Sequence, residues 1–142
     1  MLSDPNFIKN WVSTFLGKLT NELSATIEGN GLPGNLRDGV WIEREETIFG
    51  YISYTPHRDP NEESLEITLT IKFLKGAITI AIDIGWSDGE IIEEVSQNQV
   101  SYHSNSELTP KLESLSETIY ARLLSDMMKY IQVDRPPRYR SD

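Results

Sequence analysis

The sequence predicts an α+β fold, in which an antiparallel sheet of four to five strands has an N-terminal and a C-terminal helix packed on one face. Three observations lead to this prediction. The two ends of the chain repeat apolar residues at helical spacing, the middle alternates apolar and polar residues, and turn sequences separate the alternating segments. Because none of the joins between strands reads as a crossover helix, we expect the strands to be antiparallel.

The length of the chain is typical of one domain. With 142 residues and no cysteine, residues 1–133 should form a single α+β domain without disulfides. The last residues, 134–142, carry Arg135, Arg138 and Arg140 around two prolines and predict a basic, disordered tail. No apolar stretch approaches the roughly 20 residues that a membrane span needs, so we expect a cytoplasmic protein without membrane contact.

The first helix is predicted to begin at Asp4 and Pro5, which pair an N-cap acceptor with a proline in the first turn. Its apolar stripe contains Phe7, Ile8, Trp11, Val12, Phe15, Leu16, Leu19 and Leu23. The glycine-rich stretch 29–34 and the pair Asp38 and Gly39 then predict one irregular loop. Two short strands should follow, over residues 40–46 and 48–55.

The clearest strand signature is the alternation from Leu65 to Phe73. A two-residue turn at Lys75 and Gly76 should pair this strand with the next one. The predicted register sets Phe73 opposite Ile78, Ile71 opposite Ile80, Leu69 opposite Ile82 and Ile67 opposite Ile84. Apolar residues therefore meet on one face, and threonines, Lys72, Ala81 and Asp83 share the other.

A second two-residue turn, at Asp88 and Gly89, should lead into the last strand. It predicts Trp86 opposite Ile91 and Ile82 opposite Val95, but it leaves Glu93 opposite Ile84, which indicates a bulge or a peripheral strand. A polar loop over residues 97–107 should follow. Thr109 and Pro110 then predict the start of the last helix, whose apolar stripe is Leu112, Leu115, Ile119, Leu123, Met127 and Ile131.

The net charge of −9 is concentrated in the predicted sheet. Residues 40–95 contain twelve acidic and four basic side chains, which argues against binding to nucleic acid phosphates. An acidic sheet with exposed aromatic residues favours a small non-enzymatic module that docks a basic protein partner. Proteins that neutralise a toxin, accompany a secreted substrate or regulate a partner have a comparable composition. The expected contacts are Trp41, Glu43, Glu45, Glu46, Tyr51, Tyr54, Glu66 and Glu94; the aromatic residues have an alternative role as core.

Clustered carboxylates offer a second hypothesis, a calcium site that is not an EF-hand. Asp83, Asp88 and Glu90 are its candidate ligands, and Asp38 with Glu43 and Glu45 form another possible set. No other cofactor is expected. The small, weakly polar side chains of the central strands leave open a homodimer through the outward face, with Thr68, Thr70, Thr79 and Ala81 in contact.

A hydrolase-like enzyme is the third alternative. Residues 29–34 match G-x-G-x-x-G and residues 85–89 match G-x-S-x-G, but the first match lacks a following helix and the second is predicted to lie in a hairpin turn. His57 and His103 are predicted in solvent-facing loops, without metal-ligand spacing and without an acid to orient them. We therefore expect no catalytic residues.

Overall fold

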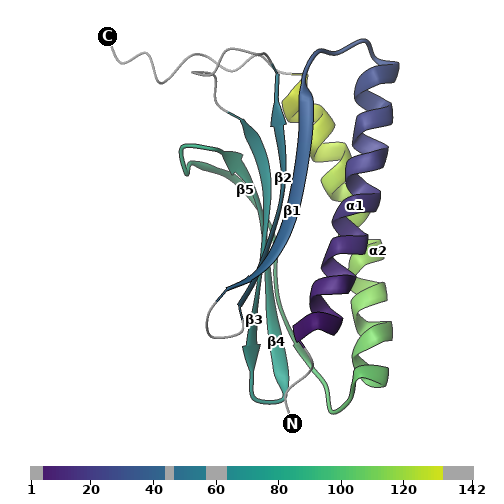
Figure 1. Cartoon of the computed structure of the whole chain (residues 1–142), viewed down its shortest axis with the longest axis vertical. Helices are drawn as coiled ribbons and strands as arrows, with labels where there is room; N and C mark the ends of the chain where they lie inside the picture. The colour runs from purple at the N-terminus through teal and green to yellow at the C-terminus, as the bar shows by residue number, and fades with distance from the viewer. Residues whose placement is uncertain (1–4, 44–46, 57–63, 133–142) are drawn as a thin grey trace.

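The computed structural model describes residues 5–43, 47–56 and 64–132. The elements follow one another as α1 (Pro5–Gly29), β1 (Asn35–Glu43), β2 (Thr47–Thr55), β3 (Leu65–Leu74), β4 (Ala77–Trp86), β5 (Ile91–Ser101) and α2 (Asn105–Ile131). The five strands form one antiparallel sheet in the order of the sequence. Both helices lie on the same face of this sheet, so the predicted fold class is confirmed (Figure 1).

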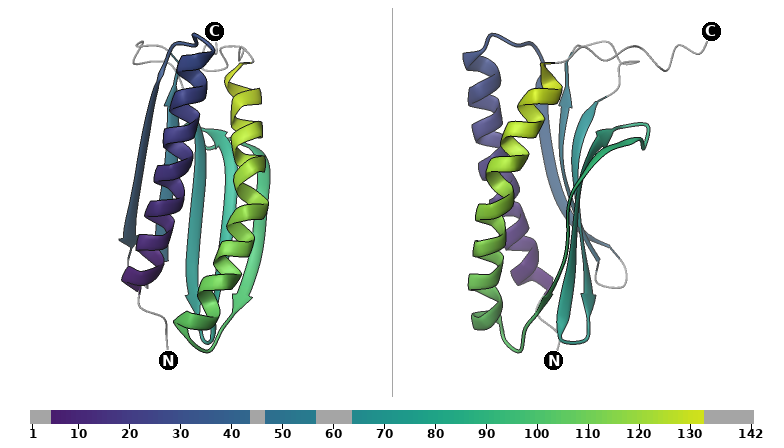
Figure 2. Two further views of the ribbon diagram at one scale, coloured as in Figure 1. Left: turned by 90° about the vertical axis from the view of Figure 1, so that its right-hand side faces the viewer. Right: turned by 180° about the vertical axis from the view of Figure 1, so that it is seen from behind.

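The two helices are as long as the sheet that they cover. Helix α1 has 25 residues and α2 has 27, and at about 1.5 Å per residue both are close to the length of a ten-residue strand. Helix α1 lies over β1 and β2, whereas α2 lies along β5 (Figure 2). The hydroxyl of Tyr120 in α2 donates to Glu22 in α1 at 2.6 Å, and the Tyr120 ring packs edge-on against Phe15. Each helix therefore buries its apolar stripe against its own half of the sheet and a flank against the other helix.

The core lies between the helices and the covered face of the sheet. Eight isoleucines from β2, β3 and β4 are fully or almost fully buried there, namely Ile48, Ile52, Ile67, Ile71, Ile78, Ile80, Ile82 and Ile84. The closest approach of α1 to the sheet is at Gly50. A Cβ atom at this position would lie 2.7 Å from Leu16 Cδ1 and 3.1 Å from Val12 Cγ1, so the helix rests directly on the backbone of β2.

The β3–β4 hairpin has the predicted turn and the predicted register. Phe73 lies opposite Ile78, Ile71 opposite Ile80, Leu69 opposite Ile82 and Ile67 opposite Ile84. Gly76 adopts a φ of 70°, a conformation that side chains disfavour and a tight turn needs. Turn chemistry and alternation thus determined the same pairing.

The register predicted for β4 and β5 is correct at Ile84 and Glu93 but wrong by one residue on either side of this pair. The connecting loop contains three residues, because the Trp86 amide donates to the Glu90 carbonyl and Gly89, at φ 98°, donates back to Trp86. This is the pattern of a three-residue hairpin with a glycine bulge. Ile91 therefore lies opposite Gly85 instead of Trp86. Farther from the loop the pairing shifts in the other direction, so that Ser96 instead of Val95 lies opposite Ile82. The predicted bulge is present, with register shifts next to Asp83 and Gly85.

Glu93 lies opposite Ile84, as predicted, and faces α2. Arg122 donates to Glu93 Oε2 from Nε at 3.1 Å and from Nη2 at 2.6 Å, and from Nη1 to the Val95 carbonyl at 2.9 Å. The Tyr130 hydroxyl donates to Glu93 Oε1 at 2.7 Å. Burial alone raises the pKa of Glu93, but these hydrogen bonds together with one shared with Asp126 hold it below the ordinary value. A carboxylate is tolerated on the covered face because α2 supplies its partners.

The first strand begins earlier than predicted. Strand β1 begins at Asn35, so Asp38 and Gly39 are inside a strand, and the loop after α1 is shorter than expected. Gly31, with a φ of 65°, follows the end of α1, and the Leu32 amide donates to the Ile27 carbonyl, which is a common way to end a helix.

Helix α2 begins five residues earlier than Thr109 and Pro110 predicted. Ser104 is the N-cap, and its side chain accepts a hydrogen bond from the Glu107 amide at 3.2 Å. Glu107 in turn accepts from the His103 amide, so Ser104 to Glu107 act much like a capping box. Strand β5 extends to Ser101 through most of the expected polar loop. Pro110 lies inside the helix, where its missing amide costs one hydrogen bond.

Candidate protein-binding face

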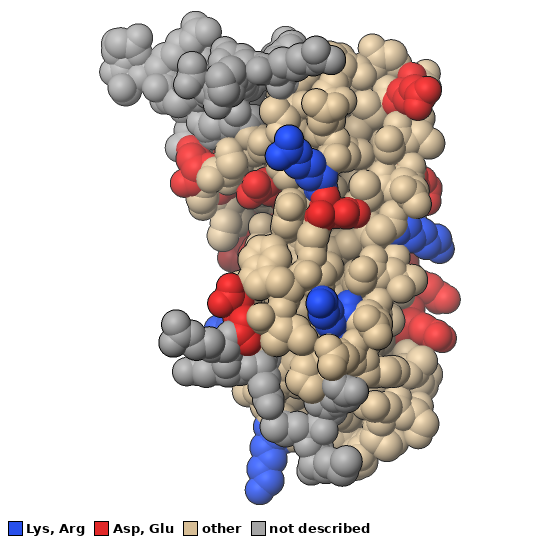
Figure 3. Space-filling view, in the orientation of Figure 1, with Lys and Arg blue, Asp and Glu red and all other residues tan. Residues whose placement is uncertain are grey.

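The side of the sheet that faces away from α1 and α2, here called the open face, is not covered by any helix or strand of the described residues. The end of the β4–β5 hairpin bends away from the helices on this side (Figures 1 and 2). Acidic side chains lie along the left-hand margin of the space-filling view, which is the open side of the sheet, and also on the helical side at the right (Figure 3). The strand register places Glu43, Glu66, Asp83 and Glu94 on the open face.

One row of side chains runs straight across four strands of the open face. The pairing register sets Tyr51 of β2 opposite Thr68 of β3, Thr68 opposite Asp83 of β4, and Asp83 opposite Glu94 of β5. At about 4.8 Å between strands, the row spans roughly 14 Å. It joins an aromatic side chain to a pair of carboxylates.

The aromatic end of this row is a cluster of Trp41, Phe49 and Tyr51. The Trp41 ring stacks on Phe49 at 5.8 Å between centroids and meets Tyr51 edge-on at 6.0 Å. Trp41 remains 43% exposed, and its indole N–H donates to Glu43 Oε1 at 2.7 Å. The Tyr51 ring lies over Gly39, where a Cβ atom would approach it to 2.7 Å. These contacts hold the three rings together as a partly exposed aromatic surface, to which Glu43 is hydrogen-bonded through Trp41.

Among the described residues, no cation forms an ion pair with the acidic end of the row. Asp83 Oδ1 is buried and accepts no hydrogen bond among the described residues. Partial burial, followed by the adjacent Glu94 carboxylate, raises the pKa of Asp83. Burial also raises the pKa of Glu66, although a hydrogen bond from Ser53 opposes this effect. A hollow of about 200 Å³ is lined in part by Glu66, Asp83, Glu90 and Trp86. A cationic group in this hollow would relieve the unfavourable electrostatics.

Five of the eight predicted contact residues lie on the open face: Trp41, Glu43, Tyr51, Glu66 and Glu94. Glu45 and Glu46 lie outside the described residues. Tyr54 was wrongly assigned to the surface. It is only 3% exposed on the covered face, where its hydroxyl donates to the Pro33 carbonyl and its ring fills the space next to Gly34. Asp83, proposed as a metal ligand, belongs instead to the acidic row.

The candidate calcium ligands are not assembled into a site. Among the described residues there is no group of three or more His, Cys, Asp or Glu side chains that could hold a metal ion, so Asp83, Asp88 and Glu90 do not converge. Asp88 Oδ1 instead accepts a hydrogen bond from the Glu90 amide within the hairpin loop. In the other proposed set, Glu45 is outside the described part of the chain.

The two sequence motifs, G-x-G-x-x-G at residues 29–34 and G-x-S-x-G at residues 85–89, lie in the loop and the hairpin that the sequence predicted. The glycines of residues 29–34 follow α1 and precede β1, without a helix after them. Ser87 lies in the hairpin loop before β5, where its hydroxyl accepts from the Ser64 amide at 3.0 Å. His103 follows the far end of β5 and is exposed, so about ten extended residues, roughly 30 Å, separate it from Ser87. These two residues cannot act as a nucleophile and base pair, and His57 lies outside the described residues.

Comparison with known proteins supplies no further assignment. No protein-family model matches the chain, and neither the curated proteins nor the solved structures contain a match. In the segments that the structure describes, no helix combines the length and the apolar character needed to cross a membrane.

Proposed function

We propose that this chain is a small, acidic, cytoplasmic protein-binding module that docks a basic protein partner on the open face of its sheet. The observation that carries this proposal is the adjacent pair Asp83 and Glu94, two carboxylates that lie opposite each other on β4 and β5 with no cation of the described residues between them. A lysine or arginine side chain of a partner would supply the missing positive charge and hydrogen bonds.

The aromatic cluster supports the same face as the contact surface. Trp41 and Tyr51 offer large, rigid contact area at low conformational cost, and exposed aromatic rings also attract guanidinium and ammonium groups. Binding residues of this kind are enriched among the contacts that contribute most to affinity. The net charge of −9 adds long-range attraction that accelerates encounter with a basic partner.

The proposal can be tested with a charge-matched pair of variants. The open-face variant combines Asp83→Asn with Glu94→Gln, and the control combines Glu113→Gln with Glu117→Gln, two exposed positions on α2. The full chain and both variants are immobilised and used to capture proteins from the native host, and captured partners are then titrated at several salt concentrations.

We expect a basic partner that the wild type and the α2 control retain equally. The open-face variant should bind it about tenfold or more weakly, and wild-type affinity should fall as salt increases. If the open-face variant binds as tightly as the control, the acidic row is not the contact surface. Captured partners that are no more basic than average, with salt-independent binding, would contradict the electrostatic basis.

A further inference from the structure

The two edges of the sheet are protected to different degrees. Edge strands expose unpaired backbone groups, and proteins usually guard them with charge, proline or bulges. Strand β1 carries Arg37, Asp38 and Glu43 along one edge. Strand β5 has acidic residues and bulges in its first part, and from Ser96 to Ser101 its pairing is regular and it contains no charged residue, glycine or proline. This second half of β5 is a regular edge without charged side chains of its own.

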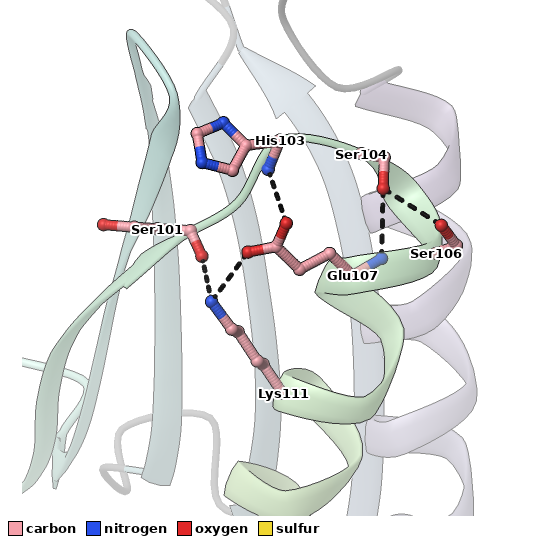
Figure 4. Close-up of polar contacts among 6 residues, drawn as sticks. All are labelled: Ser101, His103, Ser104, Ser106, Glu107 and Lys111. Atoms are coloured by element: carbon pink, nitrogen blue, oxygen red, sulfur yellow. Dashed lines mark hydrogen bonds and ion pairs between the residues drawn. The ribbon is translucent and has the colours of Figure 1, made fainter.

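The direction of the backbone groups on this edge follows from the pairing. The Tyr102 amide donates inward to the Gly76 carbonyl. Because neighbouring residues of a strand point their backbone groups to opposite sides, those of Ser101, Gln99 and Gln97 point outward, away from β4. Lys111 reaches one of them: its Nζ donates to the Ser101 carbonyl at 2.6 Å and to Glu107 at 3.1 Å (Figure 4). In the described hydrogen bonds, the outward groups of Gln97 and Gln99 have no such cap.

The surroundings of this edge leave room on both sides. A groove of about 540 Å³ lies between β5 and α2 and is lined in part by Val100, Pro110 and Leu115. A second hollow, of about 340 Å³, lies on the open face beside Gln97 and Gln99. An added strand would place its alternate side chains in these two spaces.

We propose that β5 pairs antiparallel with β5 of a second copy of this chain, about a two-fold axis at Gln99, to form one continuous ten-stranded sheet. This arrangement sets Gln97 opposite Ser101 of the other copy and exchanges about six backbone hydrogen bonds. Lys111 releases the Ser101 carbonyl in the process.

Charge complementarity selects a second copy as the occupant. Antiparallel pairing about Gln99 places Glu94, five residues before the axis, beside residue 104 of the partner, next to an end where Lys111 is balanced by its ion pair with Glu107. The acidic start of each β5 thus meets the less acidic end of the other, and the uncharged segment lies at the axis. The pairing uses the backbone edge of β5. Of the proposed contact surface it brings only Glu94 near the second copy, whereas Trp41, Tyr51 and Asp83 lie on strands away from this edge.

A cysteine scan gives a direct test, because the natural chain contains no cysteine. Directly paired residues at such an axis have Cα atoms about 5.5 Å apart, within the range that a disulfide bridges. Gln99→Cys should therefore form a covalent dimer under mild oxidation. The control Thr70→Cys, on the open face of the central strand β3, should remain uncrosslinked.

Sedimentation equilibrium provides the second measurement. The wild type should have a mass of about 32 kDa, twice that of the 16.2 kDa chain. Gln99→Lys should raise the dimer dissociation constant at least about tenfold, because it places two cations at the axis, whereas Thr70→Lys should not change it. Circular dichroism verifies that each variant is folded.

Three results would overturn the proposal. The wild type could be monomeric at about 100 μM, well above the affinity of most stable dimers. Thr70→Cys could cross-link in place of Gln99→Cys, which would indicate dimerisation through the open face. The folded Gln99→Lys variant could keep the wild-type dimer constant, which would exclude the β5 edge. Capture of an extended peptide by a monomeric wild type would likewise count against a second copy.

Discussion

The covered and open faces of the sheet are made by alternate residues of the same strands, but they have opposite chemistry. In β4, Ile78, Ile80, Ile82 and Ile84 point to the helices, whereas Thr79, Ala81 and Asp83 point away from them. The covered face excludes water, and the carboxylate of Glu93 on this face has hydrogen-bond partners on α2. On the open face, no cation of the described residues balances the negative charges of Asp83 and Glu94. The contrast separates the residues that stabilise the fold from those available for contact.

The largest difference between the faces should appear on truncation of a buried isoleucine. Ile82 is 1% exposed, and Ile82→Ala should lower the free energy of unfolding by about 2–5 kcal/mol, because lost burial and a new cavity both contribute. The neighbouring Ala81→Ser, on the open face, should change it by less than about 0.5 kcal/mol. Urea denaturation followed by tryptophan fluorescence measures both. Equal effects at the two positions would contradict the assignment of faces.

The next largest effect should come from the charged residues of the covered face. Arg122→Met leaves Glu93 facing α2 without its cation, so the free energy of unfolding should fall by less than for Ile82→Ala but by more than for Ala81→Ser. The double variant Arg122→Met with Glu93→Gln should recover much of the loss, because no unpaired charge remains. Additive effects of the two single changes in urea denaturation would mean that the pair is not coupled.

The pH dependence of stability should reveal the lowered pKa of Glu93. The pKa of Glu93 is below its ordinary value of 4.5 in the folded chain, so its ionised form adds stability above that value, and the contribution is lost as the pH falls through the lowered pKa. In Glu93→Gln this loss should be absent, and the stability profile between about pH 5 and 3 should be flatter than in the wild type. Asp126 works in the opposite direction, because burial and Glu93 raise its pKa. Thermal melts over this pH range measure the difference.

A small change in the free energy of unfolding is expected for a substitution at Asp83. Its sign is informative, because the substitution should stabilise the protein. Its raised pKa means that the charged form is disfavoured in the folded chain, so Asp83→Asn should stabilise the protein at pH 7, by no more than about 0.5 kcal/mol. The same change should weaken binding to a basic partner. A variant that is both less stable and equally competent in binding would remove Asp83 from the proposed contact surface.

The parts of the fold predicted from sequence are those in which two local signals agree. In the β3–β4 hairpin, alternation and the turn at Lys75 and Gly76 specify the same register, and every predicted apolar pair is present. In the β4–β5 hairpin the loop has three residues instead of two, which moves the register by one and places Ile91 opposite Gly85. A bulge of this kind depends on a glycine conformation that the residue types alone do not determine.

Other errors arose where two local signals competed. Thr109 and Pro110 resemble a helix start, but Ser104 and Glu107 satisfy the capping pattern earlier, and the chain uses the earlier one. Tyr54 lies on the same face as Ile48 and Ile52, so alternation within β2 was the signal that it is buried. Its aromatic type had suggested the opposite.

The candidate site was only partly predictable. Residue type identified Trp41, Tyr51 and Glu94 as surface candidates. The row from Tyr51 through Thr68 to Asp83 depends on the register between β2 and β3. These strands are joined by residues 56–64, too long a connection to fix a register through turn geometry. The partnership of Glu93 with Arg122 likewise joins positions 29 residues apart.

Gly50 shows how a position without a side chain can limit which sequences this architecture accepts. Any larger residue there would have to push Val12 and Leu16 outward and separate the two layers along their length. In a library of random variants, position 50 should therefore tolerate fewer replacements than the solvent-exposed threonines of the neighbouring strand.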